Sequence, residues 1–346
     1  MQIRFPFAAP PAPGTMTEIA EGVLWGRVPL PIRLDHVNVY ALDDGDGWTV
    51  VDTGFDDTLG QQAWAAFEAG PLRGRPVRRV VATHHHVDHI GRAGWFQARG
   101  AELVATRTAW LYARMLWLDR AEVHPAEAVA FWRGAGMAGA ALDRRVADRP
   151  FNSADVAAPL PLGYTRIVDG QVLRMGGRDW LVRTGDGHAP EHATFWSLSD
   201  GLIIGGDQLL PGISANIGVY PAEPDADPLG EWLAACRRFQ PLAEPHHLVL
   251  PGHKLPFTGL TLRLRQMIDN HLHALDRLES HLAAPRRAVE CFTPIFGREI
   301  EGGAYGLALA EAVAHLNHLW RAGRAVRWRD GDGAWLWRAQ TGDVTA

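Results

Sequence analysis

The N-terminal part of the chain alternates short apolar runs with polar turns, a pattern typical of an antiparallel β-meander. The Asp-Asp-Gly-Asp-Gly stretch at 43–47 has the composition of a hairpin turn. Residues 57–69 instead place their apolar side chains at helical spacing, and the following Gly-Pro pair predicts the end of that helix. An apolar run at 77–82 predicts a buried strand. The strands expected for the meander cover 22–30, 36–42 and 48–52.

The middle of the chain, at about 106–160, has the pattern of a helical insertion. Residues 108–118 predict a helix that is apolar nearly all round, with Trp110 and Trp117 on one face and Met115 on another. Such a helix either lies in the core or lines a pocket with one face. Both alternatives remain open, and the second would select a substrate with an apolar portion.

The C-terminal part changes to long helical patterns. Helices are expected at 225–239, 264–282 and 305–320, and residues 325–338 read as a β-hairpin. Helices followed by a hairpin suggest a winged-helix-like domain. His271 lies on the apolar stripe of the long helix, where we expect a core histidine rather than a metal ligand.

Composition limits the class of protein. The chain has 346 residues, 47% hydrophobic residues and a formal net charge of -5, which supports a large core and does not favour bulk nucleic-acid binding. The two cysteines form no disulfide framework, so a reducing cytoplasm is the expected compartment. The apolar runs are too short for a membrane span, and the proline-rich N-terminus does not resemble a signal peptide.

The segment with the most candidate metal-binding residues directly follows the strand predicted at 77–82. His84, His86, Asp88 and His89 form the pattern His-x-His-x-Asp-His. If this segment is extended, His84, His86 and Asp88 project to one side. Imidazoles and a carboxylate at this density are the ligands that Zn²⁺ prefers.

Three further candidate ligands each follow an apolar run that predicts a strand. His188 lies in Gly-His-Ala-Pro-Glu-His, Asp207 ends Leu-Ile-Ile-Gly-Gly-Asp, and His253 ends Leu-Val-Leu-Pro-Gly-His. One such residue alone is more often a turn residue or a helix cap. Together, and all after strands, they predict one site at the carboxyl ends of the strands.

These motifs resemble those of the metallo-β-lactamase-fold hydrolases, and most closely a β-lactamase-like bacterial subfamily with a C-terminal winged-helix-like domain. The resemblance implies an α/β fold, the αββα metallo-β-lactamase sandwich, over 1–257 with the insertion at about 106–160. A helical or winged-helix-like domain is then expected over 258–346.

The resemblance also implies a binuclear centre. One metal ion would take His84, His86 and His188, and the other Asp88, His89 and His253, with Asp207 and a hydroxide between them. Asp88 and Asp207 are the expected catalytic proton carriers. Asp52 and His192 match positions that support the ligands, although each could simply be structural. Zinc is the expected metal, and iron or manganese remains open.

The implied reaction is hydrolysis. A bridging aspartate such as Asp207 is typical of the thioesterases, lactonases and phosphodiesterases of the superfamily rather than its dedicated β-lactamases. His86 stands where the flavodiiron branch has a glutamate. We therefore expect a metallo-hydrolase that cleaves a carboxylic ester, thioester or lactone. The alternatives are a phosphodiesterase or ribonuclease, or a promiscuous β-lactamase-like hydrolase.

Substrate contacts and partners are less constrained by the sequence. Trp110, Met115 and Trp117 are candidate pocket residues, and Asn216 and Tyr220 are candidate oxyanion donors that could equally pack a loop. A small-molecule substrate is expected, and neither a membrane nor a nucleic acid is the expected partner. The C-terminal domain would wall one side of the active-site cleft, form a homodimer, or both.

Overall fold

The computed structural model describes residues 2–340, which divide into two compact units. The first unit comprises 1–120, 151–215 and 239–264, and the second comprises 121–150, 216–238 and 265–346. This division differs from the domain boundary expected at 257, because part of the predicted insertion and the segment 216–238 group with the C-terminal residues.

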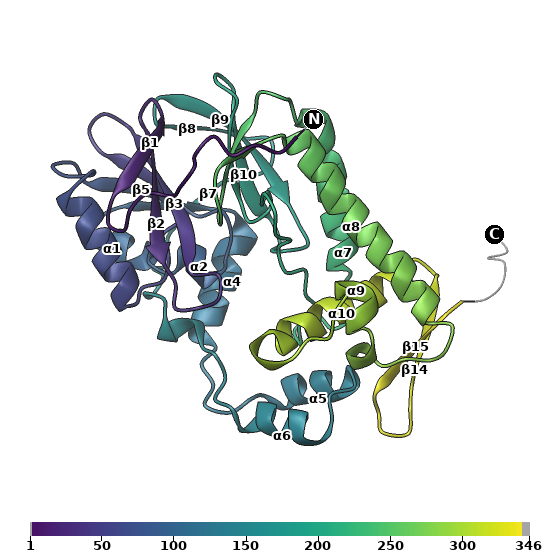
Figure 1. The fold of residues 1–346 in the computed structure, drawn as a ribbon. Coiled ribbons are helices and arrows are strands. Elements are labelled where there is room, and N and C mark those ends of the chain that lie inside the picture. Colours follow the sequence, from purple (N-terminus) through teal and green to yellow (C-terminus); the bar gives the residue numbers. More distant parts are fainter. Residues whose placement is uncertain (1, 341–346) are drawn as a thin grey trace. The chain divides into compact units, whose positions relative to one another are not determined.

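The first sheet of the first unit has seven strands in sequence order, from β1 to β7. Strands β2 to β4 form the expected antiparallel meander, β1 adds a further antiparallel strand that was not predicted, and β4, β5, β6 and β7 pair in parallel. The parallel pair β4 and β5 brings the carboxyl ends of both strands to one edge of the sheet. Figure 1 labels β1, β2, β3, β5 and β7 of this sheet. The strands are β1 Met16–Ala20, β2 Val23–Pro29, β3 His36–Asp43, β4 Trp48–Val51, β5 Val77–Val81, β6 Glu102–Ala105 and β7 Thr165–Arg166.

The second sheet has six strands in the order β13-β12-β11-β10-β9-β8. Its only parallel pair is β11 with β12, so these two strands also end at the same edge. The N-terminal segment adds an isolated bridge from Arg4 to Thr258. The strands are β8 Val172–Met175, β9 Arg178–Gly185, β10 His192–Ser197, β11 Leu202–Gly206, β12 Leu248–Pro251 and β13 Phe257–Thr258.

Two apolar layers hold the first unit together. One lies between the sheets and joins residues such as Trp25 of β2 to Trp180 of β9 and Phe195 of β10. The other packs Trp64 and Phe96 against the opposite face of the first sheet. The helices of that layer are α1 Thr58–Ala69, α3 Ala93–Ala98 and α4 Arg107–Leu118. The expected α/β sandwich is therefore present.

The local sequence explains the ends of these helices. The Asp57 carboxylate accepts a hydrogen bond from the Gly60 backbone N–H and caps α1, and Thr106 caps α4 in the same way through Ala109. Only Ala109 and Ala113 of α4 are fully buried. The small side chains therefore face the core, and the larger ones face outward or into neighbouring loops.

The second unit is mainly helical and ends in the antiparallel hairpin β14–β15, as expected. The helix α7 matches the helix expected at 225–239, and α10 matches the one expected at 305–320, whereas α6 was not predicted. Its elements are α5 Ala126–Gly134, α6 Gly139–Ala147, most of α7 Pro228–Phe239, most of α8 Leu260–His281, α9 Phe292–Phe296, α10 Tyr305–Arg321, β14 Ala325–Arg329 and β15 Trp335–Ala339.

Within 2–340, no helix has the length and apolar composition needed to cross a membrane.

Truncation of the layer between the sheets should destabilise the first unit. Phe195 is fully buried there, and Phe195→Ala is expected to lower the free energy of unfolding by about 3–5 kcal/mol. The matched control is Phe151→Ala, because Phe151 is 67% exposed and should change it by less than about 0.5 kcal/mol. Urea unfolding of both variants measures the difference, and equal losses would contradict the described core.

Candidate metal centre

The histidine-rich loop follows β5 and leads into the short helix α2, Val87–Ile90. The strand β5 ends at Val81 and the chain bends at 83–85, and the His86 carbonyl oxygen accepts hydrogen bonds from the His89 and Ile90 backbone N–H groups. The expectation that Asp88 alternates with His84 and His86 along a strand was therefore wrong. Asp88 and His89 are instead presented by a helical turn.

The first ligand group consists of His84, His86 and His188, whose candidate ligand atoms all lie within 4.8 Å of one another. His84 Nε2 lies 2.9 Å from His86 Nδ1. His188 comes from the loop between β9 and β10, on the other sheet. Two segments that are distant in sequence thus present three imidazoles to one point.

The second group consists of Asp88, His89 and His253, also within 4.8 Å of one another. His253 Nε2 lies 3.4 Å from Asp88 Oδ2 and 3.3 Å from Asp207 Oδ2. Asp207 also approaches His89 Nε2 through Oδ1 at 3.4 Å and His188 Nε2 through Oδ2 at 3.6 Å. Asp207 therefore contacts residues of both groups.

The Asp52 carboxylate fixes the orientation of two ligands. It accepts hydrogen bonds from His89 Nδ1 at 2.7 Å and from the Thr83 backbone and hydroxyl, each at 2.8 Å. The Thr83 hydroxyl donates to Asp52, so at 3.0 Å it accepts from His84 Nδ1. Both imidazoles therefore direct the lone pair of Nε2 toward the site, as metal ligands require.

His253 is oriented by a residue that the sequence analysis missed. Its Nδ1 donates to the His36 carbonyl oxygen at 2.7 Å, which leaves Nε2 to face the carboxylates. The Lys254 backbone N–H in turn donates to His36 Nε2 at 3.0 Å. The acceptor is a backbone atom at the start of β3, and a side-chain motif gives no indication of it.

His192 lies beside the ligand groups. Its ring is buried, stacks on His84 with a centroid separation of 4.5 Å, and accepts a hydrogen bond from the Asp207 backbone N–H at 3.1 Å. These contacts position Asp207. The supporting role expected for His192 is compatible with them.

Glycines allow the backbone to pass close to the ligands. A Cβ atom at Gly252 would lie 2.2 Å from Asp207 Oδ1 and 2.7 Å from His89 Cε1. Gly206 has a φ of +48°, and its Cβ would lie 2.5 Å from the His192 ring. The carboxyl ends of β11 and β12 can therefore approach the ligands only without side chains at these positions.

Burial and neighbouring charges shift the pKa values of both the histidine and the aspartate ligands. Burial lowers the pKa of His84 and His86 well below the usual value, so these imidazoles are neutral. Burial also lowers the pKa of His253, but Asp207 and Asp88 raise it by more, to about 9. For Asp207, burial by itself would raise the pKa. The neighbouring His253 and His89 lower the pKa by a larger amount, so the carboxylate is ionised. A bound cation would replace the proton on His253.

The donor set fits divalent metal ions. His89 Nε2, His253 Nε2 and Asp207 Oδ1 are buried and make no hydrogen bond within 2–340. Buried polar atoms without hydrogen bonds are costly, and metal coordination would satisfy them. Five imidazoles and two carboxylates match the nitrogen and oxygen ligands of zinc and of harder transition metals.

The predicted pocket residues of α4 have other contacts. Trp110 stacks on Tyr164 at 4.7 Å, and Trp117 Nε1 donates to the Ala157 carbonyl at 3.0 Å. Met115 is 46% exposed. Tyr112, which the sequence analysis did not single out, packs its ring 5.2 Å from His85 and links α4 to the ligand loop. A substrate contact by Trp110, Met115 or Trp117 stays a prediction.

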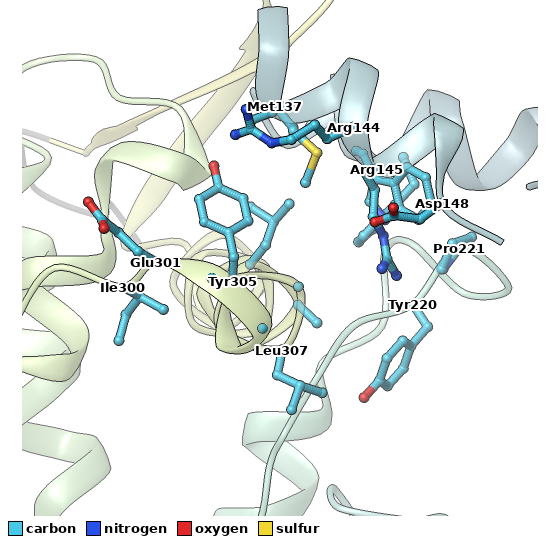
Figure 2. A pocket seen from close by; sticks show the side chains of 18 of the residues that line it. Met137, Arg144, Arg145, Asp148, Tyr220, Pro221, Ile300, Glu301, Tyr305 and Leu307 are labelled. Carbon is cyan, nitrogen blue, oxygen red and sulfur yellow. The ribbon is translucent and has the colours of Figure 1, made fainter. Parts of the chain in front are cut away.

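Asn216 and Tyr220 belong to the second unit. Tyr220 Oη donates to Asn216 Oδ1 at 3.1 Å, and Asn216 Nδ2 donates to Glu311 at 3.1 Å. Tyr220 also lines a cavity of about 960 Å³ within that unit, together with Met137, Arg144 and Leu307 (Figure 2). Their function as oxyanion donors stays a prediction.

Comparison with known proteins identifies the family. Residues 32–253 match the family model of the metallo-beta-lactamase superfamily, which covers well over half of the chain. The chain belongs to the metallo-β-lactamase superfamily. Residues 275–340 match the metallo-beta-lactamase-like C-terminal domain.

Relatives of this superfamily member align over nearly its full length. A beta-lactamase domain protein from Burkholderia ambifaria is 34% identical, with a TM-score of 0.88, over 98% of this chain and 97% of that chain. A metallo-beta-lactamase family protein from Thermus thermophilus is 25% identical, with a TM-score of 0.77, over 93% and 100%. The probable metallo-hydrolase YqjP of Bacillus subtilis (strain 168) is 26% identical over 86% and 92%. The chain is therefore a metallo-hydrolase of this fold.

The close backbone approach at Gly252 gives a test of the centre. Gly252→Ala is expected to displace Asp207 and weaken metal binding by roughly 10- to 100-fold, as changes that reorient ligands do. The control is Gly163→Ala, since no atom lies within 4 Å of a Cβ atom there. Competition with a chromophoric chelator measures both affinities. Equal affinities in folded variants would show that Asp207 does not depend on this approach.

Proposed function

We propose that the protein is a binuclear metal-dependent hydrolase of carboxylic esters, thioesters or lactones that carry an apolar portion. The observation that carries this proposal is the convergence of two ligand groups on Asp207, whose carboxylate approaches His89, His188 and His253. A carboxylate between two sets of imidazoles has the arrangement expected of a ligand shared by two metal ions.

Divalent metal ions held by the two ligand groups would supply an acidified water as nucleophile and would polarise the bond to be cleaved. The protein supplies orientation. Asp52 and the His36 carbonyl hold the Nδ1–H groups of His89 and His253, so their Nε2 atoms face inward. Burial excludes water from His84, His89 and His253, which strengthens each electrostatic contact in the centre.

Asp88 is the better candidate for proton transfer to solvent. Its side chain is 17% exposed, against 9% for Asp207, and its Oδ2 lies 3.4 Å from His253 Nε2. A carboxylate in contact with both the centre and solvent can accept a proton and release it. Asp207 is more enclosed, and its contacts with both ligand groups suit it to binding metal.

The apolar portion of the substrate is inferred from α4. Leu111, Met115 and Leu118 on this helix are 46–58% exposed, although they are large apolar side chains. The Tyr112–His85 contact places α4 next to the ligand loop. An apolar surface next to a hydrolytic centre suits an acyl or other apolar group.

Zinc is the proposed metal because imidazole nitrogen dominates the donor set. A cytoplasmic location, a homodimer and a winged-helix-like architecture of the C-terminal part belong to the same proposal. The helices α8 to α10 followed by the hairpin β14–β15 support the last of these.

Nucleic-acid hydrolysis is the less favoured alternative, because two arginines near the C-terminus that could contact phosphates already form ion pairs with carboxylates. Arg324 pairs with Asp276 and Glu279, and Arg327 pairs with Asp225. Arg327 also lies 3.6 Å from the centroid of the Trp320 ring. Cations held in this way offer little charge to phosphates, which dominate nucleic-acid affinity.

The proposal is tested with a panel of thioester, lactone, β-lactam, phosphodiester and RNA substrates. Turnover of an ester, thioester or lactone is expected to disappear after dialysis against a chelator and to return with Zn²⁺. Preferential turnover of RNA or a phosphodiester would favour the alternative that the protein is a nuclease or phosphodiesterase. Metal-independent turnover would exclude the proposed chemistry.

Substitution of the proposed proton carrier should slow catalysis without unfolding the protein. Asp88→Asn is expected to lower kcat by roughly 10²- to 10⁴-fold, because the amide cannot accept the proton. Asp46→Asn is the control, since Asp46 is exposed and pairs only with Arg78 among the ion pairs of the described chain. Steady-state kinetics and metal content are measured together. Full activity of the metal-loaded Asp88→Asn variant would contradict the assignment.

Charge reversal tests whether Arg324 and Arg327 bind RNA or only form ion pairs within the protein. Arg324→Glu combined with Arg327→Glu is expected to leave kcat/KM for a small ester within about 2-fold, because ion pairs of this kind contribute mainly to stability. A nuclease that uses these side chains would instead lose RNA affinity and much of its salt dependence. Filter binding at two salt concentrations makes the comparison.

A further inference from the structure

The second unit contains a separate cluster of metal-binding residue types, His271, Glu311 and His315. His271 lies on α8, and Glu311 and His315 lie one turn apart on the same face of α10. His271 is 6% exposed and His315 is 1% exposed. One ligand atom from each of the three residues lies within 4.8 Å of the other two.

The imidazole of His315 has a defined orientation. Its Nδ1 donates a hydrogen bond to the Glu311 backbone carbonyl at 2.8 Å, because a carbonyl oxygen can only accept. The proton is therefore on Nδ1, and the lone pair is on Nε2. Nε2 faces His271 Nδ1 at 3.3 Å. A backbone carbonyl that fixes a histidine in this way is typical of metal-binding histidines.

The Glu311 carboxylate is positioned by a hydrogen bond from Asn216. Asn216 Nδ2 donates to its Oε2 at 3.1 Å and to the Leu307 carbonyl at 3.3 Å. Tyr220 donates in turn to Asn216 Oδ1, so the amide is fixed at both ends. Because of these contacts the carboxylate has a defined place beside the two imidazoles.

The spacing matches that of the metal centre in the first unit. There, imidazole nitrogens lie 3.3–3.7 Å from the Asp88 and Asp207 oxygens, and the nitrogens of His84 and His86 are 2.9 Å apart, so ligand atoms are separated by 2.9–3.7 Å. The separation of 3.3 Å between His271 Nδ1 and His315 Nε2 falls in the same range. Two nitrogens at roughly 2.0–2.1 Å from a tetrahedral zinc ion are also about 3.3 Å apart.

We propose that His271, Glu311 and His315 form a further metal site, which binds a divalent transition-metal ion such as Zn²⁺. Two imidazoles and one carboxylate are a known zinc ligand set, and the fourth position would be taken by water. Without an ion, His271 and His315 share one hydrogen bond and the Glu311 carboxylate accepts one from Asn216, so a bound cation would add a direct contact to each of the three side chains. The core histidine expected from the stripe of α8 would therefore be a ligand instead.

The cavity of about 960 Å³ lies next to residues that contact the Asn216–Glu311 pair and would give the ion a route toward the site. Tyr220, Leu307 and Ala310 line it, and these residues directly precede or contact the Asn216–Glu311 pair. Figure 2 shows Tyr220, Leu307, Arg144 and Arg145 among the labelled side chains that line this cavity. A metal site needs such an entry path as well as its ligands.

The ion would connect three segments of the second unit, namely α8, α10 and the loop at 216–220. Among the contacts of this loop, Val219 N–H donates to the Ala310 carbonyl at 3.0 Å. The function of the bound ion would therefore be structural. Binding to the folded state alone stabilises that state in proportion to the logarithm of the metal concentration.

The test uses the full chain with the first centre disabled by His84→Ala, Asp88→Ala and His253→Ala. Metal is removed, the protein is dialysed against Zn²⁺, and bound zinc is measured by elemental analysis. This parent is expected to keep one equivalent of zinc and to show a higher Tm with zinc than without it. Substitution of Co²⁺ should produce the visible absorption of a tetrahedral site. A parent that binds no zinc would overturn the proposal.

Three further variants of this parent assign the ligands. Glu311→Gln and His271→Gln are expected to weaken zinc binding by roughly 10-fold or more and to abolish the rise in Tm. His318→Gln is the matched control, because His318 lies on the same helix and contacts Asp227 instead. Circular dichroism checks folding. Unchanged zinc binding in both ligand variants would place the ion elsewhere and contradict the proposal.

Because these measurements need no substrate, they are independent of the hydrolase proposal. Loss of the further site would leave ester turnover by the unmodified metal centre untouched. Conversely, a protein without hydrolase activity could still bind this ion. The two proposals therefore fail separately.

Discussion

The hydrogen bonds of the Asp52 carboxylate are the constraint on which the metal centre depends. Asp52 directly follows β4 and has a positive φ of 60°, which non-glycine residues rarely adopt. From there it binds the Thr83 backbone, the Thr83 hydroxyl and His89 Nδ1. One buried anion thus ties the ends of two parallel strands together and also sets the tautomers of His84 and His89. The strain at Asp52 is compensated by the contacts that it makes.

Much of this arrangement could be predicted from the sequence because ligands and strands coincide. Apolar runs ending in His, Asp or Gly-His marked β5, β11 and β12, and parallel pairing brings the ends of β11 and β12 together. The α/β sandwich followed from the same pattern. Positions within the turn after β5 could not be predicted, since the hydrogen bonds from His89 and Ile90 to His86 start a helix at Val87.

Other features depended on tertiary contacts that no local pattern contains. The helix α6 forms after a glycine-rich stretch, and β10 gains its stability by pairing with both β9 and β11. The His36 carbonyl supports His253 although 217 positions separate them. Asn216 follows shortly after Asp207 in sequence, yet Asn216 belongs to the second unit, where its amide donates to Glu311 of the same unit. Proximity in sequence was a poor guide to proximity in space here.

The two histidine clusters differ in how their charges are balanced. In the first unit, Asp88 and Asp207 raise the pKa of His253, so carboxylates and imidazoles already compensate one another. In the second unit, burial raises the pKa of Glu311 to about 7, although a hydrogen bond from Asn216 lowers it, and burial lowers the pKa of His315 to about 4. The first cluster is organised before metal arrives, whereas the second would gain most from a cation.

The position of α4 has a consequence for how such a protein can diversify. The ligands are set by strand ends, by Asp52 and by glycines that tolerate no side chain, so almost any change among them would be lost by selection. The outward residues of α4, such as Leu111, Met115 and Leu118, carry no ligand and contribute little to the core. Mutations can therefore accumulate on this helix while the chemistry stays intact. Proteins descended from one ancestor could in this way come to accept different substrates while the ligand residues stay the same.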